Sequence, residues 1–329
     1  MREIVFTRKN KDKWLNYEKI LSDKQYLNPE ELTQIYLDLT DDLAYANTYY
    51  PDSKLATYIN ELAGMAHRRI YKTRKTGRNA IIRFYTHDFP LMFYAYRKYL
   101  LFAFLVFVIF AGIGAFSASQ DADFVRLILG DAYVDMTLEN IDKGDPMAVY
   151  KQAHEIDMFL GITINNIKVA LYTFLMGIFL GLGTLYYMMN NAIMLGAFQY
   201  FFYAKNMFWE SVRTIWIHGT IEISVIIVAG AAGFVLASGI LMPGTYTRTQ
   251  SFIQKARDGL KIMLSTIPFF IIAGFLEGFV TRHTGMPDWL AVLIILLSLS
   301  VIVFYYIFLP AIIYHRYNTL KNNNYENQI

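Results

Sequence analysis

The chain contains no cysteine among its 329 residues. This absence excludes disulfides, thiolate metal sites and a cysteine nucleophile, and it fits any cellular compartment. Charged residues are also scarce, at 17% of the chain against 55% hydrophobic residues. The formal net charge of +3 is too small to indicate nucleic-acid binding. The first residues, "MREIVFTRKNKDKW", hold no apolar stretch of signal-peptide length, so we expect no cleavable targeting segment.

The hydrophobic residues collect into runs long enough to cross a bilayer, which takes about 20 apolar residues per helix. We therefore predict an all-α fold, that of a polytopic helical membrane protein. The predicted parts are a cytoplasmic helical domain at 1–97, a first transmembrane helix at 98–119, an acidic extracytoplasmic loop at 120–161, a transmembrane bundle at 162–314 and a cytoplasmic tail at 315–329.

The first 97 residues are polar enough to be water-soluble. Asn28 is a plausible N-cap and Pro29 a first helical residue, and apolar residues then recur at helical spacing through two segments that Pro51 separates. These patterns predict a helical hairpin preceded by a helix around Trp14–Leu21. A small bundle packed on itself and a docking surface for a partner are both compatible with this pattern.

The distribution of charge predicts the topology. Residues 119–161 hold nine acidic residues against three lysines and arginines, whereas 68–83 and the expected loop 242–261 are basic. Basic segments beside a membrane helix usually face the cytoplasm, which requires an even number of crossings between those two segments. Predicted spans at 165–189, 212–241, 262–280 and 289–313 satisfy this only if the short stretch 192–204 also crosses. We predict about six transmembrane helices with the N-terminus in the cytoplasm, or five if 192–204 re-enters.

Ionisable residues inside predicted spans are the candidate functional residues. His218 and Glu222 lie four residues apart in "HGTIEISVIIVAGAAG", and so on one face of a helix. Glu277, Asn165 and Asn166 fall at a similar depth in neighbouring spans. Such groups are costly in a membrane and are usually paired or face a cavity. We predict an intramembrane polar cluster in the outer leaflet. Repulsion between its carboxylates requires that one be protonated or that His218 carry charge between them.

Three roles are open for this cluster: a structural network, transport or gating, and metal binding or catalysis. A His and a carboxylate at this spacing can chelate a metal, but the HExxH pattern of zinc proteases is absent because Gly219 follows the histidine. No phosphate-binding loop, calcium loop or hydrolase triad is present. We therefore assign no catalytic residue, no metal and no cofactor, and favour the structural network.

Small residues predict where helices pack closely. Gly177 and Gly181 form a GxxxG pair, and Gly230 and Gly233 lie on a small-residue helix face; Gly219 completes the predicted packing set.

Three motifs carry a resemblance to the stage II sporulation protein M family of integral membrane proteins. "HGTIEISVIIVAGAAG" matches its HG-x-x-E helix, "NNIKVALYTFLMGIFLGLGTLYYMMNNAIMLGA" resembles its asparagine- and glycine-rich stretch, and "FLEGFVTRH" resembles a third. The N-terminal helices resemble those of non-sporulating members. Asn190-Asn191 stands where the family often has Asn-Gly. The resemblance implies the fold, a bacterial inner-membrane location and a scaffold-like role, since the sporulation member is an anchor that recruits peptidoglycan-degrading partners and is no hydrolase.

We thus expect a non-enzymatic membrane scaffold or anchor that recruits partner proteins at the cell envelope through residues 1–97 and through the outer loop, with self-association left open. The alternative is a transporter or channel component that uses His218, Glu222 and Glu277. A permeation path should show polar residues at several depths, whereas the inner halves of these spans are almost purely apolar, which favours the scaffold.

Overall fold

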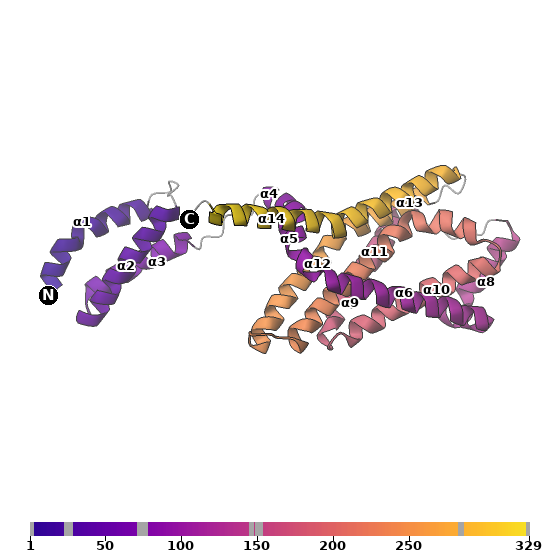
Figure 1. The fold of residues 1–329 in the computed structure, drawn as a ribbon, viewed down its shortest axis with the longest axis horizontal. Helices are drawn as coiled ribbons and strands as arrows, with labels where there is room; N and C mark the ends of the chain where they lie inside the picture. Colours follow the sequence, from indigo (N-terminus) through magenta and orange to yellow (C-terminus); the bar gives the residue numbers. More distant parts are fainter. Residues whose placement is uncertain are drawn as a thin grey trace. The chain divides into compact units, whose positions relative to one another are not determined.

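The computed structural model describes residues 3–22, 29–70, 78–144, 148, 154–281 and 286–326. Every regular element in these ranges is a helix (Figure 1), so the all-α class is confirmed. Tertiary contacts divide the chain into two compact units, Met1–Ala80 and Ile81–Ile329.

The first unit consists of three helices, α1 (Glu3–Ser22), α2 (Pro29–Tyr49) and α3 (Lys54–Ile70). They enclose a core of their own in which Trp14, Leu39 and Ile59 are fully buried. The Trp14 indole N–H donates to the Asp42 carboxylate at 2.8 Å and the Tyr17 hydroxyl donates to Asp38 at 2.6 Å, so α1 is joined to α2. The hairpin and its preceding helix are as predicted, with a longer first helix. The proposed N-cap, Asn28, lies outside the described residues.

Residues 81–97 belong to the second unit and not, as we expected, to the soluble domain. They form the short helices α4 (Arg78–Arg83), η1 (Phe84–Asp88), α5 (Phe89–Phe93) and η2 (Tyr94–Tyr96). Phe89 and Phe93 are fully buried in the core of the second unit, and the Tyr96 hydroxyl donates to Asp258 at 2.6 Å. The aromatic side chains explain this placement, because burying them requires the larger core.

Five continuous helical stretches of the second unit are long and apolar enough to cross a membrane: Ala80–Gln120, Glu155–Ile178, Phe208–Leu241, Arg248–Val280 and Asp288–Leu320. They contain α6 (Arg97–Gln120), α9 (Glu155–Leu175) with η4 (Met176–Ile178), α11 (Phe208–Leu241), α12 (Arg248–Phe275) with η5 (Leu276–Val280), and α13 (Asp288–Val303) with η6 (Phe304–Phe308) and α14 (Leu309–Glu326). The predicted polar tail from residue 315 is therefore a continuation of the last helix.

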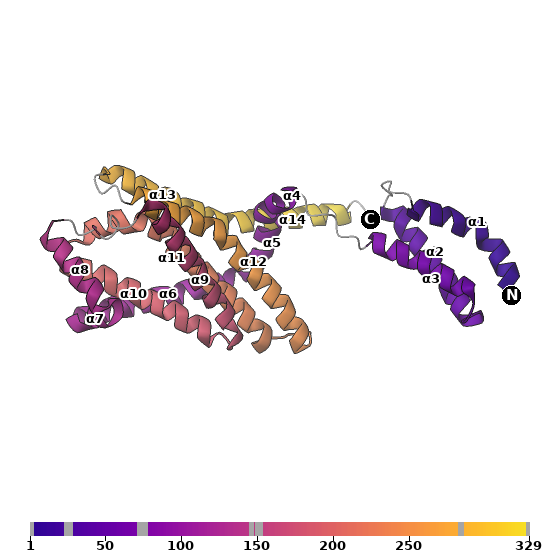
Figure 2. The same cartoon turned by 180° about the vertical axis from the view of Figure 1, so that it is seen from behind.

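A sixth long helix, α10 (Leu182–Ala204), packs lengthwise on α6. It is less apolar than the five stretches because it carries Asn190, Asn191 and Gln199. Figures 1 and 2 show that the α9–α10 and α11–α12 turns lie at one end of the unit, while the α10–α11 turn and the start of α13 lie at the other. The six helices therefore alternate in direction. The stretch 192–204 is part of one continuous helix.

The boundaries of two predicted segments were wrong. The expected span 165–189 is two helices, because the chain turns at Phe179–Gly181, where Leu180 and Gly181 adopt φ of 54° and 84°. The expected loop 242–261 is only six residues long, because Thr247 and Gln250 form a capping box that starts α12 at Arg248. The acidic segment between α6 and α9, expected to be a loop, contains the helices α7 (Ala122–Leu129) and α8 (Asp131–Asp142).

Helix α11 is the centre of the second unit. It packs against α6, α9, α10, α12 and α13, and the most apolar window of its span is 78% buried. At 34 residues it is about 50 Å long, since an α-helix rises 1.5 Å per residue. Residues that lie on α11 are thus placed within reach of most other helices of the bundle.

Candidate functional site

The structure brings His218, Glu222, Glu277 and Asn166 together near the end of the bundle where α10 turns into α11. His218 and Glu222 come from α11, Glu277 from the π-helix η5 and Asn166 from α9. One ligand atom from each of His218, Glu222 and Glu277 lies within 4.8 Å of the other two. The three ionisable residues were predicted from spacing and depth alone.

Hydrogen bonds fix the side chains of this polar cluster, by which we mean His218, Glu222, Glu277, Asn166 and Thr281. The Asn166 amide donates to Glu222 Oε1 at 2.5 Å. His218 Nδ1 lies 3.1 Å from the Thr281 hydroxyl, and His218 Nε2 lies 3.7 Å from Glu277 Oε1. His218 is only 4% exposed. In the described ranges, no lysine or arginine forms an ion pair with either glutamate.

The π-helix at the end of α12 positions two of these residues. A π-turn carries one more residue per turn than an α-turn, and such turns are frequent at functional sites. Glu277 lies within η5, and the Thr281 amide closes the turn by donating to the Leu276 carbonyl at 2.9 Å. Thr281 was missed by the sequence analysis, because its contact with His218 depends on this local widening of the helix.

A cavity of about 370 Å³ adjoins the cluster. Its polar wall consists of Asn166, Asn191, His218 and Glu222, and the rest of its lining is apolar or small. Ile128, Leu129 and Tyr133 from the segment between α6 and α9 also border it. The cavity is large enough to hold several water molecules, whose share of liquid volume is about 30 Å³ each.

Not every predicted site residue reaches the cluster. Asn165 is exposed on α9, whereas its neighbour Asn166 points to Glu222. Gly219 lies beside the cavity, and a Cβ there would touch only Ile215 and Ile223 of its own helix, at 3.7 Å or more. It therefore makes no close contact with another helix in the described chain.

The remaining predicted glycines lie where backbones meet below the cluster. A Cβ on Gly177 would overlap the Gly233 backbone, and one on Gly233 would overlap the side chain of Thr184. A Cβ on Gly230 would overlap Met188. Gly181 instead occupies the left-handed turn that starts α10. The interpretation of Gly177 and Gly181 as a GxxxG helix face was wrong, because the helix ends between them.

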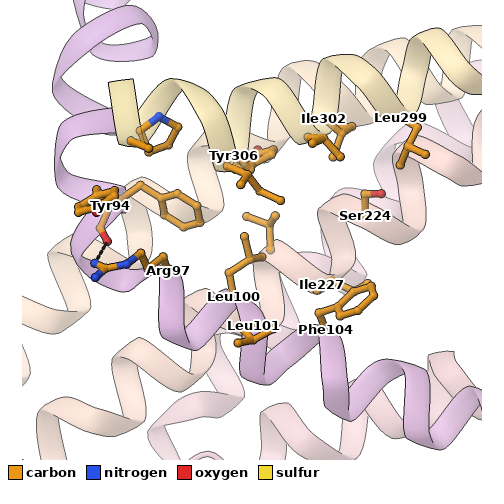
Figure 3. A pocket seen from close by; sticks show the side chains of 16 residues that line it. Tyr94, Arg97, Leu100, Leu101, Phe104, Ser224, Ile227, Leu299, Ile302 and Tyr306 are labelled. Carbon is orange, nitrogen blue, oxygen red and sulfur yellow. Dashed lines mark hydrogen bonds between the residues drawn. The ribbon is translucent and has the colours of Figure 1, made fainter. Parts of the chain in front are cut away.

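A larger cavity of about 680 Å³ lies between α6 and α13–α14, over α11. Its lining is almost entirely aliphatic and aromatic, as Figure 3 shows for Leu100, Phe104, Ile227 and Leu299. Arg97 stands at one end, where it donates to the Tyr94 carbonyl at 2.9 Å. Such a lining suits hydrocarbon and gives a hydrated ion few polar partners.

A bundle of helices this long and apolar, with five stretches able to cross a membrane, defines the chain as a polytopic membrane protein. Residues 103–282, more than half of the chain, match the family described as stage II sporulation protein M, and the chain belongs to this family. The matched residues include all five members of the polar cluster.

Other comparisons add little about function. Residues 4–72 match a family described as a domain of unknown function. An uncharacterized protein of Methanocaldococcus jannaschii, MJ0706, is 24% identical over 151 residues, which are 45% of this chain and 67% of that protein. No solved structure matches the chain.

Proposed function

We propose that this protein is a non-enzymatic scaffold of the cytoplasmic membrane, which recruits partner proteins at the cell envelope through its N-terminal unit in the cytoplasm. The observation that carries the proposal is the way the bundle closes below the polar cluster. Between Val225 and Gly239, α11 has no ionisable side chain. In this stretch Gly230 and Gly233 contact α10 and η4 so closely that no water fits between the helices at these two points.

The hydroxyl groups buried in this region support the same proposal. Thr184 donates to the Thr173 carbonyl at 2.7 Å and Thr173 donates to the Val169 carbonyl at 2.8 Å. Because these donors are used within the helices, they offer no continuous chain of groups for carrying a proton. The cluster then serves to fix α9, α11 and the end of α12 relative to one another.

The N-terminal unit suits recruitment because it has its own core. Leu39 and Ile59 are buried in it, while Leu37 and Tyr49 of α2 are half exposed. An independent core leaves the outer faces of the helices available to a partner.

A transporter or channel component is the second candidate, favoured by the cavity beside the cluster. The cavity gives Glu222 and His218 space for water or a small solute. Transport would require the contacts around Gly233 to open in a second conformation.

The experiment places a photo-crosslinking residue at Leu37, which is exposed, or at Leu39, which is fully buried, in the full-length chain. Recruitment predicts a discrete adduct from Leu37 and none from Leu39. Flux of protons or small ions into proteoliposomes is measured in parallel on the parent and on Glu222→Gln. No adduct from any exposed position of α2, together with flux that Glu222→Gln abolishes, would replace the scaffold with the transporter.

A further inference from the structure

The polar cluster has the composition and spacing of a metal site. One imidazole nitrogen and two carboxylates come within 4.8 Å of one another. In a tetrahedral zinc site, bonds of about 2.0–2.2 Å place ligand atoms about 3.3 Å apart. The 3.7 Å between His218 Nε2 and Glu277 Oε1 is close to that separation, and metal binding would require the remaining ligand atoms, now within 4.8 Å of one another, to move closer by rotation of the glutamate side chains.

Supporting hydrogen bonds already orient two of the three ligands. The Thr281 hydroxyl lies 3.1 Å from His218 Nδ1, which leaves Nε2 directed at Glu277. Asn166 binds Glu222 Oε1 and leaves its second oxygen available. Metal-binding histidines and carboxylates typically have outer hydrogen bonds of this kind, which fix the ring orientation and the direction of the free atom.

The charge of the cluster also requires a partner. Two carboxylates this close, in a bundle within the membrane, repel each other and are poorly solvated. The described residues supply no lysine or arginine to pair with them. Two protons or one divalent cation would neutralise the two carboxylates, and a cation would in addition be coordinated by His218.

We propose that His218, Glu222 and Glu277 bind one divalent metal ion, with Zn²⁺ the best fit to a mixed nitrogen and oxygen ligand set. The adjoining cavity leaves the fourth position to water or to a small ligand, and the protein ligands join α11 to the end of α12. This site does not depend on the scaffold function, since a metal that clamps helices and a metal that binds a solute use the same three ligands.

The test measures metal bound to the full-length chain, purified in detergent through a tag without histidine. After dialysis against Zn²⁺ and removal of free metal, we expect about one equivalent per chain. His218→Ala and Glu277→Gln should bind none. Thr281→Val should keep the ligands but weaken binding by about 10–100-fold, because it removes the outer contact with His218 together with the hydroxyl's bond to the Leu276 carbonyl. Asn165→Ala is the matched control for Asn166→Ala: it should bind as the parent does, while Asn166→Ala should bind more weakly.

A second measurement covers variants that fail to fold. Co²⁺ added to metal-free parent should give a visible absorption band that Zn²⁺ abolishes. Zn²⁺ should also raise the melting temperature of the parent, and the rise should grow with the logarithm of the Zn²⁺ concentration above the dissociation constant. The proposal would be wrong if the parent chain bound no more metal than the His218→Ala variant and showed neither a cobalt band nor a thermal shift. Protons alone would then neutralise the cluster.

Discussion

At the scale of single residues, Glu222 joins the two sides of the polar cluster. It accepts a hydrogen bond from Asn166 on α9 and lies beside His218 and Glu277, which brings α11 and η5 to the same point. A buried polar network of this kind stabilises one helix arrangement only while each member keeps its partner. The chemistry of the Glu222 side chain should therefore matter more than its volume.

Substitutions at Glu222 separate the contribution of its hydrogen bonding from that of its volume. Measured in chelator, so that metal plays no part, Glu222→Gln should unfold close to the parent because its amide oxygen still accepts from Asn166. Glu222→Leu has a similar size but strands the Asn166 donor, at a cost of about 1–3 kcal/mol. Thermal unfolding in detergent measures both. Equal destabilisation by Gln and Leu would mean that the hydrogen bond to Asn166 contributes nothing.

The sequence could predict the members of this cluster better than their orientation. The spacing of His218 and Glu222 places both on one helix face wherever that helix lies, and the apolar flanks of Glu277 give its depth. Asn165 and Asn166 could not be separated, because the face of α9 that meets α11 depends on the rotation of a packed helix. Only the structure shows that Asn166 points inward and Asn165 outward.

At the scale of helices, the pair α6–α10 depends on two glycines that the sequence analysis passed over. A Cβ on Gly196 would overlap the Ala111 backbone, and one on Gly114 would overlap the Ile193 backbone. Each glycine lies opposite the partner helix, so the two backbones approach on both sides of the contact. This close packing accounts for a helix as polar as α10 lying within the bundle.

Glycine-to-alanine substitutions on α6 and α10 should differ sharply in their effect on the stability of the protein. Gly196→Ala should destabilise the protein by about 1–3 kcal/mol, because backbone cannot move aside as a flexible side chain can. Gly112→Ala on α6 is the control, since its Cβ would have no neighbour within 4 Å, and it should be neutral or slightly stabilising. Melting temperatures in one detergent compare the two. A Gly196→Ala protein as stable as Gly112→Ala would contradict the contact.

The turn between α9 and α10 shows why helix boundaries were harder to predict. Apolar residues run without interruption from Leu175 through Leu182, so hydrophobicity gives no sign of a break. Gly181 looked like a packing residue, yet it supplies the positive φ that the turn requires. A run of apolar residues predicts that the chain stays in the membrane, but not that it remains one helix.

At the scale of the whole molecule, the N-terminal unit should fold without the membrane unit. Its core holds Trp14 and Leu39, and three hydroxyl or indole groups donate to carboxylates between its helices. Burial and the hydrogen bond to Asp38 raise the pKa of Tyr17 to about 12, and burial and the bond to Glu18 raise that of Tyr58 likewise. Both tyrosines therefore stabilise the fold in their neutral form.

A fragment of residues 1–80 tests whether this unit folds alone, and its stability should depend on pH in a defined way. The unfolded pKa of tyrosine is about 10, so the contribution of each raised pKa is complete below about pH 10 and is lost as pH rises through 12. The urea midpoint, followed by circular dichroism, should fall over that window. In the Tyr17→Phe/Tyr58→Phe variant the fall should be smaller. A fragment without helical signal at neutral pH would show that this unit needs the rest of the chain.

The alternating direction of the six helices predicts which turns share a side of the membrane. The end of α8, beside Gly144, and the α10–α11 turn, with Asn206, lie at the end of the bundle away from the α9–α10 turn, with Leu180, and the α11–α12 turn, with Thr245. Because Arg97 and Lys98 and the first turns of α12 are basic, we expect the Leu180 and Thr245 turns to face the cytoplasm. Because the chain has no cysteine, single cysteines at these four positions can be labelled with an impermeant maleimide on intact cells. We expect labelling at 144 and 206 and none at 180 and 245 until the cells are opened. Labelling at 144 and 245 without 206 would mean that α10 does not cross the membrane. Labelling at 180 and 245 alone would mean that the protein has the opposite orientation in the membrane.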